Sequence, residues 1–345
     1  MEENKQHKTA LPETEPIPSA QAPEALLDIR GLRVEYHTDE DVVYAVNGLD
    51  LTIGKGESLG LVGETGAGKT TTALSVLRLI ADPPGKIMGG EIWFEGEDML
   101  QAKPARLREI RGSKISVIFQ DPMTSLNPVY SVGDQIAEVI HQHEKCSKEE
   151  GRRKAGDMLE MVGIPRARYD EYPHQFSGGM KQRVMIAIAL ACSPELLIAD
   201  EPTTALDVTI QAQVLELMKK LKQEYQTSLI LITHDLGVVA KICDKVAVVY
   251  AGEIVESRTL KEIYTDKRHP YTIGLFDSLP DIENDASTLK VIQGMVPDPA
   301  NLPDGCKFHP RCPYAKEACQ TGKIKPVKLS DSHMVRCNRF SDTEV

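Results

Sequence analysis

The stretch ESLGLVGETGAGKT, residues 57–70, decides the fold of this chain of 345 residues. Residues 57–62 form a short apolar run that is typical of a buried strand. Residues 63–70 match the pattern G-x-x-x-x-G-K-[ST], and a helix is expected from Thr70. Strand, Gly-rich loop and helix in this order indicate a phosphate-binding loop. A chance Gly-rich turn is the alternative, and this context argues against it.

The chemistry of such a loop follows from its residue types. Glycines let backbone N–H groups turn inward around phosphates, and the helix N-terminus adds its positive end. We expect Lys69 to reach the β- and γ-phosphates of a nucleotide and the Thr70 hydroxyl to hold Mg²⁺. The predicted nucleotide-binding residues of the loop are Gly63, Glu64, Thr65, Gly66, Ala67, Gly68, Lys69, Thr70 and Thr71.

A pair of acids follows a second apolar run further along the chain. Residues 196–199 predict a buried strand, and Asp200 and Glu201 come directly after it. In this position Asp200 is expected to contact Mg²⁺ and Glu201 to act as general base on the attacking water. Two acids after a strand are also common as a helix cap or a surface turn. The phosphate-binding loop upstream favours the catalytic interpretation.

Strands and helices alternate on both sides of these two motifs. Further strands are expected at 115–119, 228–233 and 245–250, and helices at 178–191 and 210–225. This alternation predicts an α/β fold around a parallel sheet with crossover connections. Strand-like sequence at 26–36, 42–53 and 91–94 adds a β region, and 133–163 is helical and charged.

Composition narrows the partners. The formal net charge is -11, which argues against a nucleic-acid partner because phosphate binding needs clustered Lys and Arg. No apolar run predicts a membrane-spanning helix, and residues 1–24 have the composition of a disordered tail without a signal peptide. We therefore expect a cytoplasmic protein. If it works at a membrane, another subunit must hold it there.

One further motif resembles a known family. FSGGMKQR, residues 176–183, resembles the L-S-G-G-Q signature of ABC transporter ATPases, with Phe176 and Met180 departing from the common form. Ser177, Gly178 and Gly179 at a helix start are expected to form a second phosphate clamp. The resemblance implies that this clamp meets ATP held by another ATPase subunit.

The other family motifs occur in the expected order. Gln120 resembles the Q-loop glutamine, which senses Mg²⁺ and water, and 205–207 resembles the D-loop. His234 resembles the switch histidine that contacts the γ-phosphate, and Tyr36 the aromatic residue that stacks on adenine, with Tyr44 competing for that role. The resemblance thus implies Glu201, His234 and Gln120 as catalytic residues and Thr70, Gln120 and Asp200 around Mg²⁺.

Several segments indicate the branch of the family. QDPMTSLNP (120–128), YPHQF (172–176), HPYT (269–272) and GCKFHPRCP (305–313) resemble ATPases of dipeptide, oligopeptide and nickel importers, in their D-type. This resemblance implies ATP-driven import of di- or oligopeptides, with nickel or another small solute as the alternative cargo. A non-transport ABC ATPase of DNA repair or translation is the rival hypothesis.

The same resemblance implies partners and a place in the cell. It predicts a similar F-type ATPase as heterodimer partner, two permease subunits and an external solute-binding protein. The chain would then lie at the cytoplasmic face of the membrane, attached through the permease.

The predicted fold is therefore a P-loop NTPase of the ABC type. It combines a parallel or mixed sheet core, an antiparallel β subdomain, a helical subdomain at about 121–176 and a Cys-rich C-terminal extension. The predicted boundaries are a tail at 1–24, the nucleotide-binding domain at 25–265 and the extension at 266–345.

Four cysteines crowd the extension: Cys306, Cys312, Cys319 and Cys337. Their spacing is not the C-x-x-C of zinc ribbons, but four soft thiolates in one short segment are able to hold a 4Fe-4S cluster. Some D-type relatives carry such a cluster, and these positions fit that pattern. We predict a structural 4Fe-4S cluster, with zinc (His309 replacing one thiol) or unmetallated thiols as alternatives.

Overall fold

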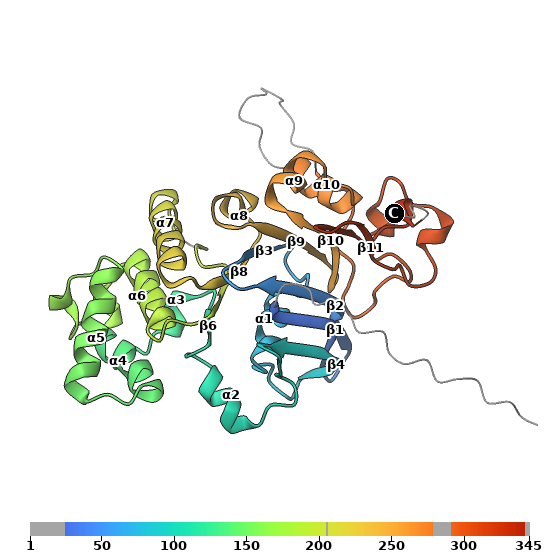
Figure 1. Cartoon of the computed structure of the whole chain (residues 1–345). Coiled ribbons are helices and arrows are strands. Elements are labelled where there is room, and N and C mark those ends of the chain that lie inside the picture. Colours follow the sequence, from blue (N-terminus) through green and yellow to red (C-terminus); the bar gives the residue numbers. More distant parts are fainter. Residues whose placement is uncertain (1–24, 205, 279–290, 342–345) are drawn as a thin grey trace, which may run out of the picture.

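The computed structural model describes residues 25–204, 206–278 and 291–341 (Figure 1). The predicted tail at 1–24 and Ala205 of the D-loop lie outside these ranges.

An eight-stranded mixed sheet runs through the centre of the described chain, in the order β11-β12-β10-β9-β3-β8-β7-β6. The five consecutive strands from β9 to the β6 edge pair in parallel. They are β9 (Lys245–Tyr250), β3 (Ser58–Val62), β8 (Ser228–Thr233), β7 (Leu196–Asp200) and β6 (Ile115–Ile118). Every residue of β3, β7 and β8 is buried, as expected for parallel strands covered on both faces.

Alternating side chains of these strands belong to two separate hydrophobic cores, one on each face of the sheet. Leu229 and Leu231 of β8 join the core under the helices α6 (Gly178–Leu190), α7 (Val208–Tyr225) and α8 (Leu236–Ile242). Ile230 and Ile232 point to the opposite face and join the core around α1 (Lys69–Val76). The period of two along a strand therefore fixes helices on both faces.

A second sheet packs on the α1 side. It is antiparallel with the order β2-β1-β4-β5, formed by β1 (Ala25–His37), β2 (Val42–Gly54), β4 (Gly85–Phe94) and β5 (Glu97–Asp98). The helix α2 (Pro104–Ile110) leads from this sheet back to β6. Figure 1 shows α1 between the two sheets.

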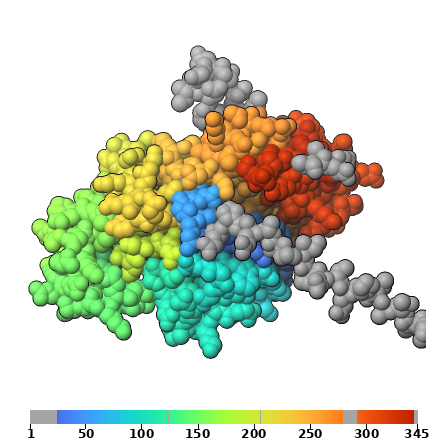
Figure 2. Space-filling model, viewed as in Figure 1, coloured from blue at the N-terminus to red at the C-terminus, as the bar shows by residue number. Residues whose placement is uncertain are grey.

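Short helices fill the range 121–176. They are α3 (Pro122–Ser125), α4 (Val132–His143), α5 (Lys148–Met161), η1 (Arg166–Arg168) and η2 (Pro173–Gln175). Ser131 and Ser147 cap α4 and α5 by accepting hydrogen bonds from the backbone N–H groups of Asp134 and Glu150. In Figure 2 these residues (green) form one end of the molecule and the C-terminal residues (red) the other.

The C-terminal segment, residues 291–341, is built into the core sheet. After β10 (Glu253–Thr259) the chain forms α9 (Leu260–Thr265) and α10 (Pro270–Asp277). It then returns through η3 (His309–Arg311), η4 (Glu317–Cys319), β11 (Val327–Ser330), β12 (His333–Val335) and η5 (Asn338–Phe340). β12 pairs with β10 through Val335 opposite Glu256 and Met334 opposite Ser257. Neither β11 nor β12 is predicted from the sequence, because runs of three or four residues are too short to display a period.

Within the described ranges, no helix combines the length and apolar character needed to cross a bilayer.

Candidate nucleotide-binding site

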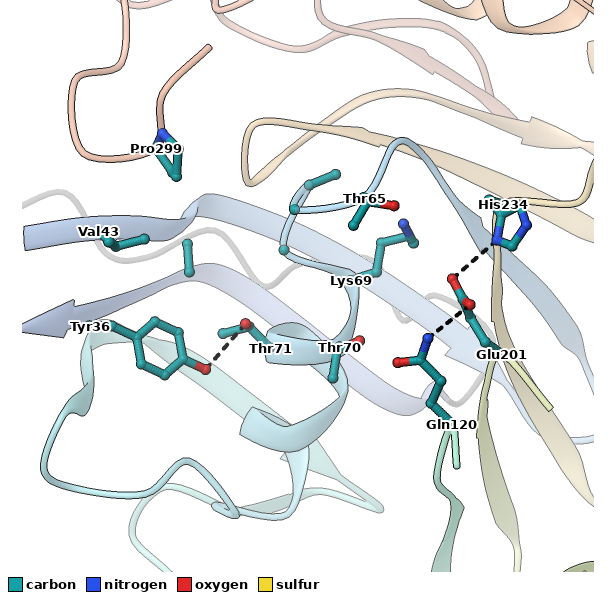
Figure 3. A pocket seen from close by; sticks show the side chains of 14 residues that line it. Tyr36, Val43, Thr65, Lys69, Thr70, Thr71, Gln120, Glu201, His234 and Pro299 are labelled. Carbon is teal, nitrogen blue, oxygen red and sulfur yellow. Dashed lines mark hydrogen bonds and ion pairs between the residues drawn. The ribbon is translucent and has the colours of Figure 1, made fainter. Parts of the chain in front are cut away.

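A pocket of about 450 Å³ opens above the phosphate-binding loop (Figure 3). It lies at the carboxyl ends of the parallel strands, where α/β sheets place their ligands. Seven of its lining residues belong to the loop and the first turn of α1, and the rest come from distant segments. The lining residues are Tyr36, Val43, Ala45, Thr65, Gly66, Ala67, Gly68, Lys69, Thr70, Thr71, Gln120, Glu201, His234 and Pro299.

The loop has the geometry that its sequence predicts. β3 ends at Val62 and α1 begins at Lys69, with Gly68 at the N-cap in the left-handed region, φ 94°. A Cβ on Gly68 would overlap the carbonyl oxygen of Ala45, so both the backbone angle and the space require glycine. The helix N-terminus consequently opens directly into the pocket.

Lys69 is held inside the loop. Its Nζ donates to the carbonyl oxygens of Gly63 at 2.7 Å and of Glu64 at 3.0 Å. Burial lowers the pKa of Lys69, and the carboxylates of Glu201 and Asp200 oppose that shift. The two carbonyl oxygens hold the Lys69 ammonium in the loop, where phosphate oxygens of a bound nucleotide are able to replace them.

Asp200 lies at the end of β7 and is 5% exposed. Its Oδ1 is buried and has no hydrogen-bond partner among the described residues. Burial raises the pKa of Asp200, whereas a hydrogen bond from Thr70 acts in the opposite direction. An unpartnered buried carboxylate oxygen is costly, and a cation would satisfy it. The pair of Asp200 and Thr70 therefore fits a Mg²⁺ site.

Glu201 is the centre of a hydrogen-bond network across three strand ends (Figure 3). Gln120 Nε2 donates to its Oε2 at 3.1 Å, and the Thr204 hydroxyl donates to the same oxygen at 2.9 Å. His234 Nδ1 lies 3.2 Å from Oε1. Burial raises the pKa of Glu201, but the bonds from Thr204 and His234 outweigh it and the net shift is downward. The carboxylate is thus kept ionised and aimed into the pocket.

The far end of the pocket is formed by β1, β2 and the C-terminal segment. Tyr36 pairs with Val43 in the sheet, both line the pocket, and the Tyr36 hydroxyl lies 3.3 Å from that of Thr71. Tyr44, which follows Val43 in β2, lines a different cavity. Pro299 faces the same end of the pocket, and its carbonyl oxygen accepts a hydrogen bond from the Tyr44 N–H at 2.9 Å.

Some predicted residues lie outside this pocket. Ser177 and Gly178 are exposed at the start of α6, and neither lines it. Ser177 occupies the N-cap without a side-chain hydrogen bond to the helix, and a Cβ on Gly179 would overlap Ile210 of α7. Gly63, Glu64 and Asp200 also do not line the pocket. The Glu64 carboxylate pairs with Arg311 instead. No sequence pattern pointed to Val43, Ala45, Pro299 or Arg311.

The prediction of a 4Fe-4S cluster is wrong. Cys306, Cys312, Cys319 and Cys337 are all free, and the described ranges contain no group of three or more His, Cys, Asp or Glu side chains arranged to hold a metal ion. The zinc alternative with His309 fails on the same finding. Burial raises the pKa of Cys306 to about 11 and also raises those of Cys312 and Cys337, which favours neutral thiols over the thiolates that metals need.

The sheet order, the loop and the acid pair define a P-loop nucleotide-binding protein. Comparison with known proteins gives the family. Residues 46–204 match the family described as ABC transporter, and residues 255–319 match the oligopeptide/dipeptide transporter C-terminal region.

Two relatives from Bacillus subtilis (strain 168) match nearly the whole chain. The oligopeptide transport ATP-binding protein AppD is 50% identical over 319 residues, which cover 92% of this chain and 97% of AppD. The oligopeptide transport ATP-binding protein OppD is 50% identical over 314 residues, covering 90% of this chain and 88% of OppD. The chain therefore belongs to the oligopeptide/dipeptide family of ABC transporter ATP-binding proteins and is an ABC-type ATPase.

A solved structure supports the fold. The dimeric post-hydrolysis state of the ATP-binding cassette MJ0796, bound to ADP and Pi, is 28% identical with a TM-score of 0.61. It covers 68% of this chain, which covers 98% of MJ0796. The predicted ABC cassette fold of mixed sheets and helices is thereby confirmed, and ATP with Mg²⁺ is the ligand that the family implies.

Proposed function

We propose that this chain hydrolyses ATP to drive the import of di- or oligopeptides through a membrane permease. The observation that carries the proposal is the pocket lined by Lys69, Thr70 and Glu201 in a chain 50% identical to two oligopeptide transport ATP-binding proteins. Asp200 lies directly before Glu201, buried at the end of β7. The match at 255–319 to the oligopeptide/dipeptide transporter C-terminal region supports the peptide branch.

Binding follows from the loop. Lys69 exchanges the carbonyl oxygens of Gly63 and Glu64 for the β- and γ-phosphates, and loop N–H groups from Thr65 to Thr71 hold the same oxygens. Tyr36 stacks on adenine at the far end. Thr70, Asp200 and Gln120 would hold Mg²⁺, and the cation would supply positive charge that neutralises the phosphates.

Hydrolysis follows from the network around Glu201. The ionised carboxylate takes a proton from the attacking water as general base. Gln120 orients this carboxylate from the segment after β6, and His234 does so from the opposite side. His234 would also contact the γ-phosphate of bound ATP. Because both hydrogen bonds already exist, the base needs little reorganisation when water and nucleotide enter.

The second half of each ATP site comes from another subunit. Ser177, Gly178 and Gly179 are placed away from their own pocket, on an exposed helix start whose N–H groups are able to bind phosphate. We propose that they close on ATP held by an F-type ATPase partner, whose signature closes on the pocket of this chain. The dimeric MJ0796 cassette is a precedent for pairing between cassettes.

The permease contact belongs to the helical part. Val129 and Tyr130 are 72% and 55% exposed, beside a cavity of about 590 Å³ lined by Asp134, His141 and Arg152. We propose a nucleotide-binding domain at 25–265 whose helical subdomain, about 121–176, receives the coupling helices of the permease at the cytoplasmic face of the membrane. The permease itself consists of two subunits. The remaining partner is an external binding protein, and residues 266–345 form a C-terminal extension.

The test is reconstitution in proteoliposomes with the F-type ATPase, the permease pair and the binding protein. We expect uptake of a labelled tripeptide that requires ATP, with ATPase activity stimulated by the loaded binding protein. A complex carrying Glu201→Gln is the control and should not transport. Uptake of Ni²⁺ without uptake of peptide would contradict the cargo, and ATPase activity unaffected by any solute would contradict coupling.

A further inference from the structure

The side chain of Glu64 does not line the nucleotide pocket. Although Glu64 belongs to the phosphate-binding loop, both of its carboxylate oxygens are bound by Arg311 of the C-terminal segment. Arg311 Nη1 lies 2.7 Å from Oε2 and Nη2 lies 3.1 Å from Oε1. Two parallel N–H···O bonds from one guanidinium fix both position and orientation. A residue 247 positions later in the chain thus holds the first turn of the loop.

Arg311 is itself fixed in place. Its side chain is 5% exposed, its Nε donates to the Gln293 carbonyl oxygen at 3.2 Å and its Nη1 donates to the Tyr250 hydroxyl at 3.3 Å. The guanidinium carbon also lies 5.9 Å from the centre of the Phe308 ring. The grip on Glu64 therefore comes from a rigid, largely buried group.

A second contact fixes the backbone at the same residue. The N–H of Glu64 donates to the Tyr271 hydroxyl at 2.9 Å. Tyr271 is fully buried on α10, and its ring centre lies 4.6 Å from that of Tyr250 and 5.4 Å from that of Phe308. Side chain and main chain of Glu64 are thus both held by groups outside the cassette motifs.

These contacts bear on nucleotide binding for two reasons. The carbonyl oxygen of Glu64 is one of the two acceptors that hold Lys69 Nζ. The position of Glu64 therefore determines the position of the Lys69 ammonium group before ATP binds. The Glu64 carboxylate would also repel a triphosphate if it turned inward. Arg311 neutralises this charge and keeps it on the outer side of the loop.

We propose that Arg311 is a positioning residue for ATP, which acts through Glu64 and makes the C-terminal segment a working part of the nucleotide site. This inference rests on the proposed ATP site. Because the segment and the nucleotide then stabilise the same loop conformation, each must strengthen the other by the same factor. ATP is accordingly expected to slow amide hydrogen exchange in residues 306–319.

The test compares Arg311→Met with Arg311→Lys, using binding of a fluorescent ATP analogue to the full chain and steady-state ATPase kinetics of the reconstituted transporter complex. For Arg311→Met we expect affinity to fall on the order of ten- to hundredfold, in line with the cost of misplacing a binding group. KM for ATP should rise with kcat at saturation nearly unchanged, since the Glu201 network is untouched. Arg311→Lys keeps one charged contact and should lose less.

Glu64→Gln supplies the double-mutant cycle. If Arg311 acts through Glu64, Arg311→Met should weaken binding much less in the Glu64→Gln background than in the natural chain. Arg339→Met is the matched control, because Arg339 belongs to the same segment but stacks on Tyr314 and does not contact the loop. Should Arg311→Met fail to fold, Tyr271→Phe keeps the buried ring and removes only the bond to the Glu64 N–H, with an expected loss of about three- to tenfold.

The outcomes separate this inference from the proposed function. Wild-type chain that does not bind the ATP analogue overturns both. Wild-type binding together with unchanged affinity in Arg311→Met, or in Tyr271→Phe if that variant must be used, overturns the inference alone. Equal losses in both Glu64 backgrounds, or a fall in kcat without a change in KM, would also overturn it.

Discussion

The phosphate-binding loop and the four-cysteine segment both crowd reactive groups into a short piece of chain, but they are built differently. The loop lines the pocket with consecutive residues, 65–71, and one strand-to-helix turn brings them to the same end of the sheet. The cysteines are spread over residues 306–337, where only Cys319 lies within a helix, η4, and the other three lie in connections between short elements. One backbone bond, from the Cys306 N–H to the Cys319 carbonyl oxygen at 2.9 Å, brings two of these stretches together.

A motif predicts a site when local backbone geometry alone brings its groups together. Where the groups meet only through tertiary contacts, their spacing along the chain says little about whether their atoms converge. The following predictions test that contrast, starting with the largest expected effect.

Replacing the general base should abolish most of the hydrolysis. Glu201→Gln keeps the shape and the hydrogen-bonding partners but cannot accept a proton, so we expect kcat to fall by about 10²- to 10⁴-fold with ATP binding retained. Steady-state ATPase assays and binding of a fluorescent ATP analogue measure the two quantities. Glu317→Gln, the same change at an exposed position, is the control. An unaffected kcat would show that the motif does not locate the base.

Removing the anchor of the C-terminal segment should destabilise the whole fold. Phe308 is 2% exposed and packs against Tyr250 and Tyr271, so Phe308→Ala should lower the free energy of unfolding by about 3–5 kcal/mol. Urea unfolding followed by circular dichroism measures the change. Tyr314→Ala, at a residue 51% exposed, should change it by no more than about 0.5 kcal/mol. A separate early transition for the segment would contradict its place in the common core.

The smallest effect concerns Cys306, one of the four cysteines that were wrongly predicted to hold a 4Fe-4S cluster. Burial raises the pKa of Cys306 to about 11, so the thiolate fraction, and with it the rate of alkylation by iodoacetamide, should rise about tenfold per pH unit between pH 8 and 10. Peptide mass spectrometry gives the rate at each cysteine. Cys192, whose pKa is also raised by burial to about 11, is the matched reference outside the segment. A flat profile at Cys306 beside a steep one at Cys192 would mean that burial does not govern this thiol.

The sequence predicted the parts of the site that depend on strand ends. Gln120, Asp200, Glu201 and His234 each follow a short apolar run, and parallel strands bring their carboxyl ends to one edge. The choice between Tyr36 and Tyr44 was not decided by the motif. It depends on the β1–β2 register, in which Tyr36 faces Val43 and Tyr44 faces Glu35.

Other parts were beyond any local pattern. The pair of Arg311 and Glu64 and the bond from Tyr44 to Pro299 join residues hundreds of positions apart. β12 is three residues long and exists because the edge of β10 offers it partners. Such contacts follow from the folded chain as a whole, and a single sequence carries no periodic signal for them.

The late position of Pro299, Arg311 and β12 in the chain has a consequence for synthesis on the ribosome. The phosphate-binding loop and both acids leave the ribosome well before Arg311, which holds Glu64, and Pro299, which lines the far end of the pocket. At about 5–20 residues per second, the stretch from residue 278 to 336 takes roughly 3 to 12 seconds to make. During part of that interval the nascent chain already contains the phosphate-binding loop but not yet Arg311, which holds Glu64 in place. The nucleotide site is therefore among the last parts of the molecule to be completed.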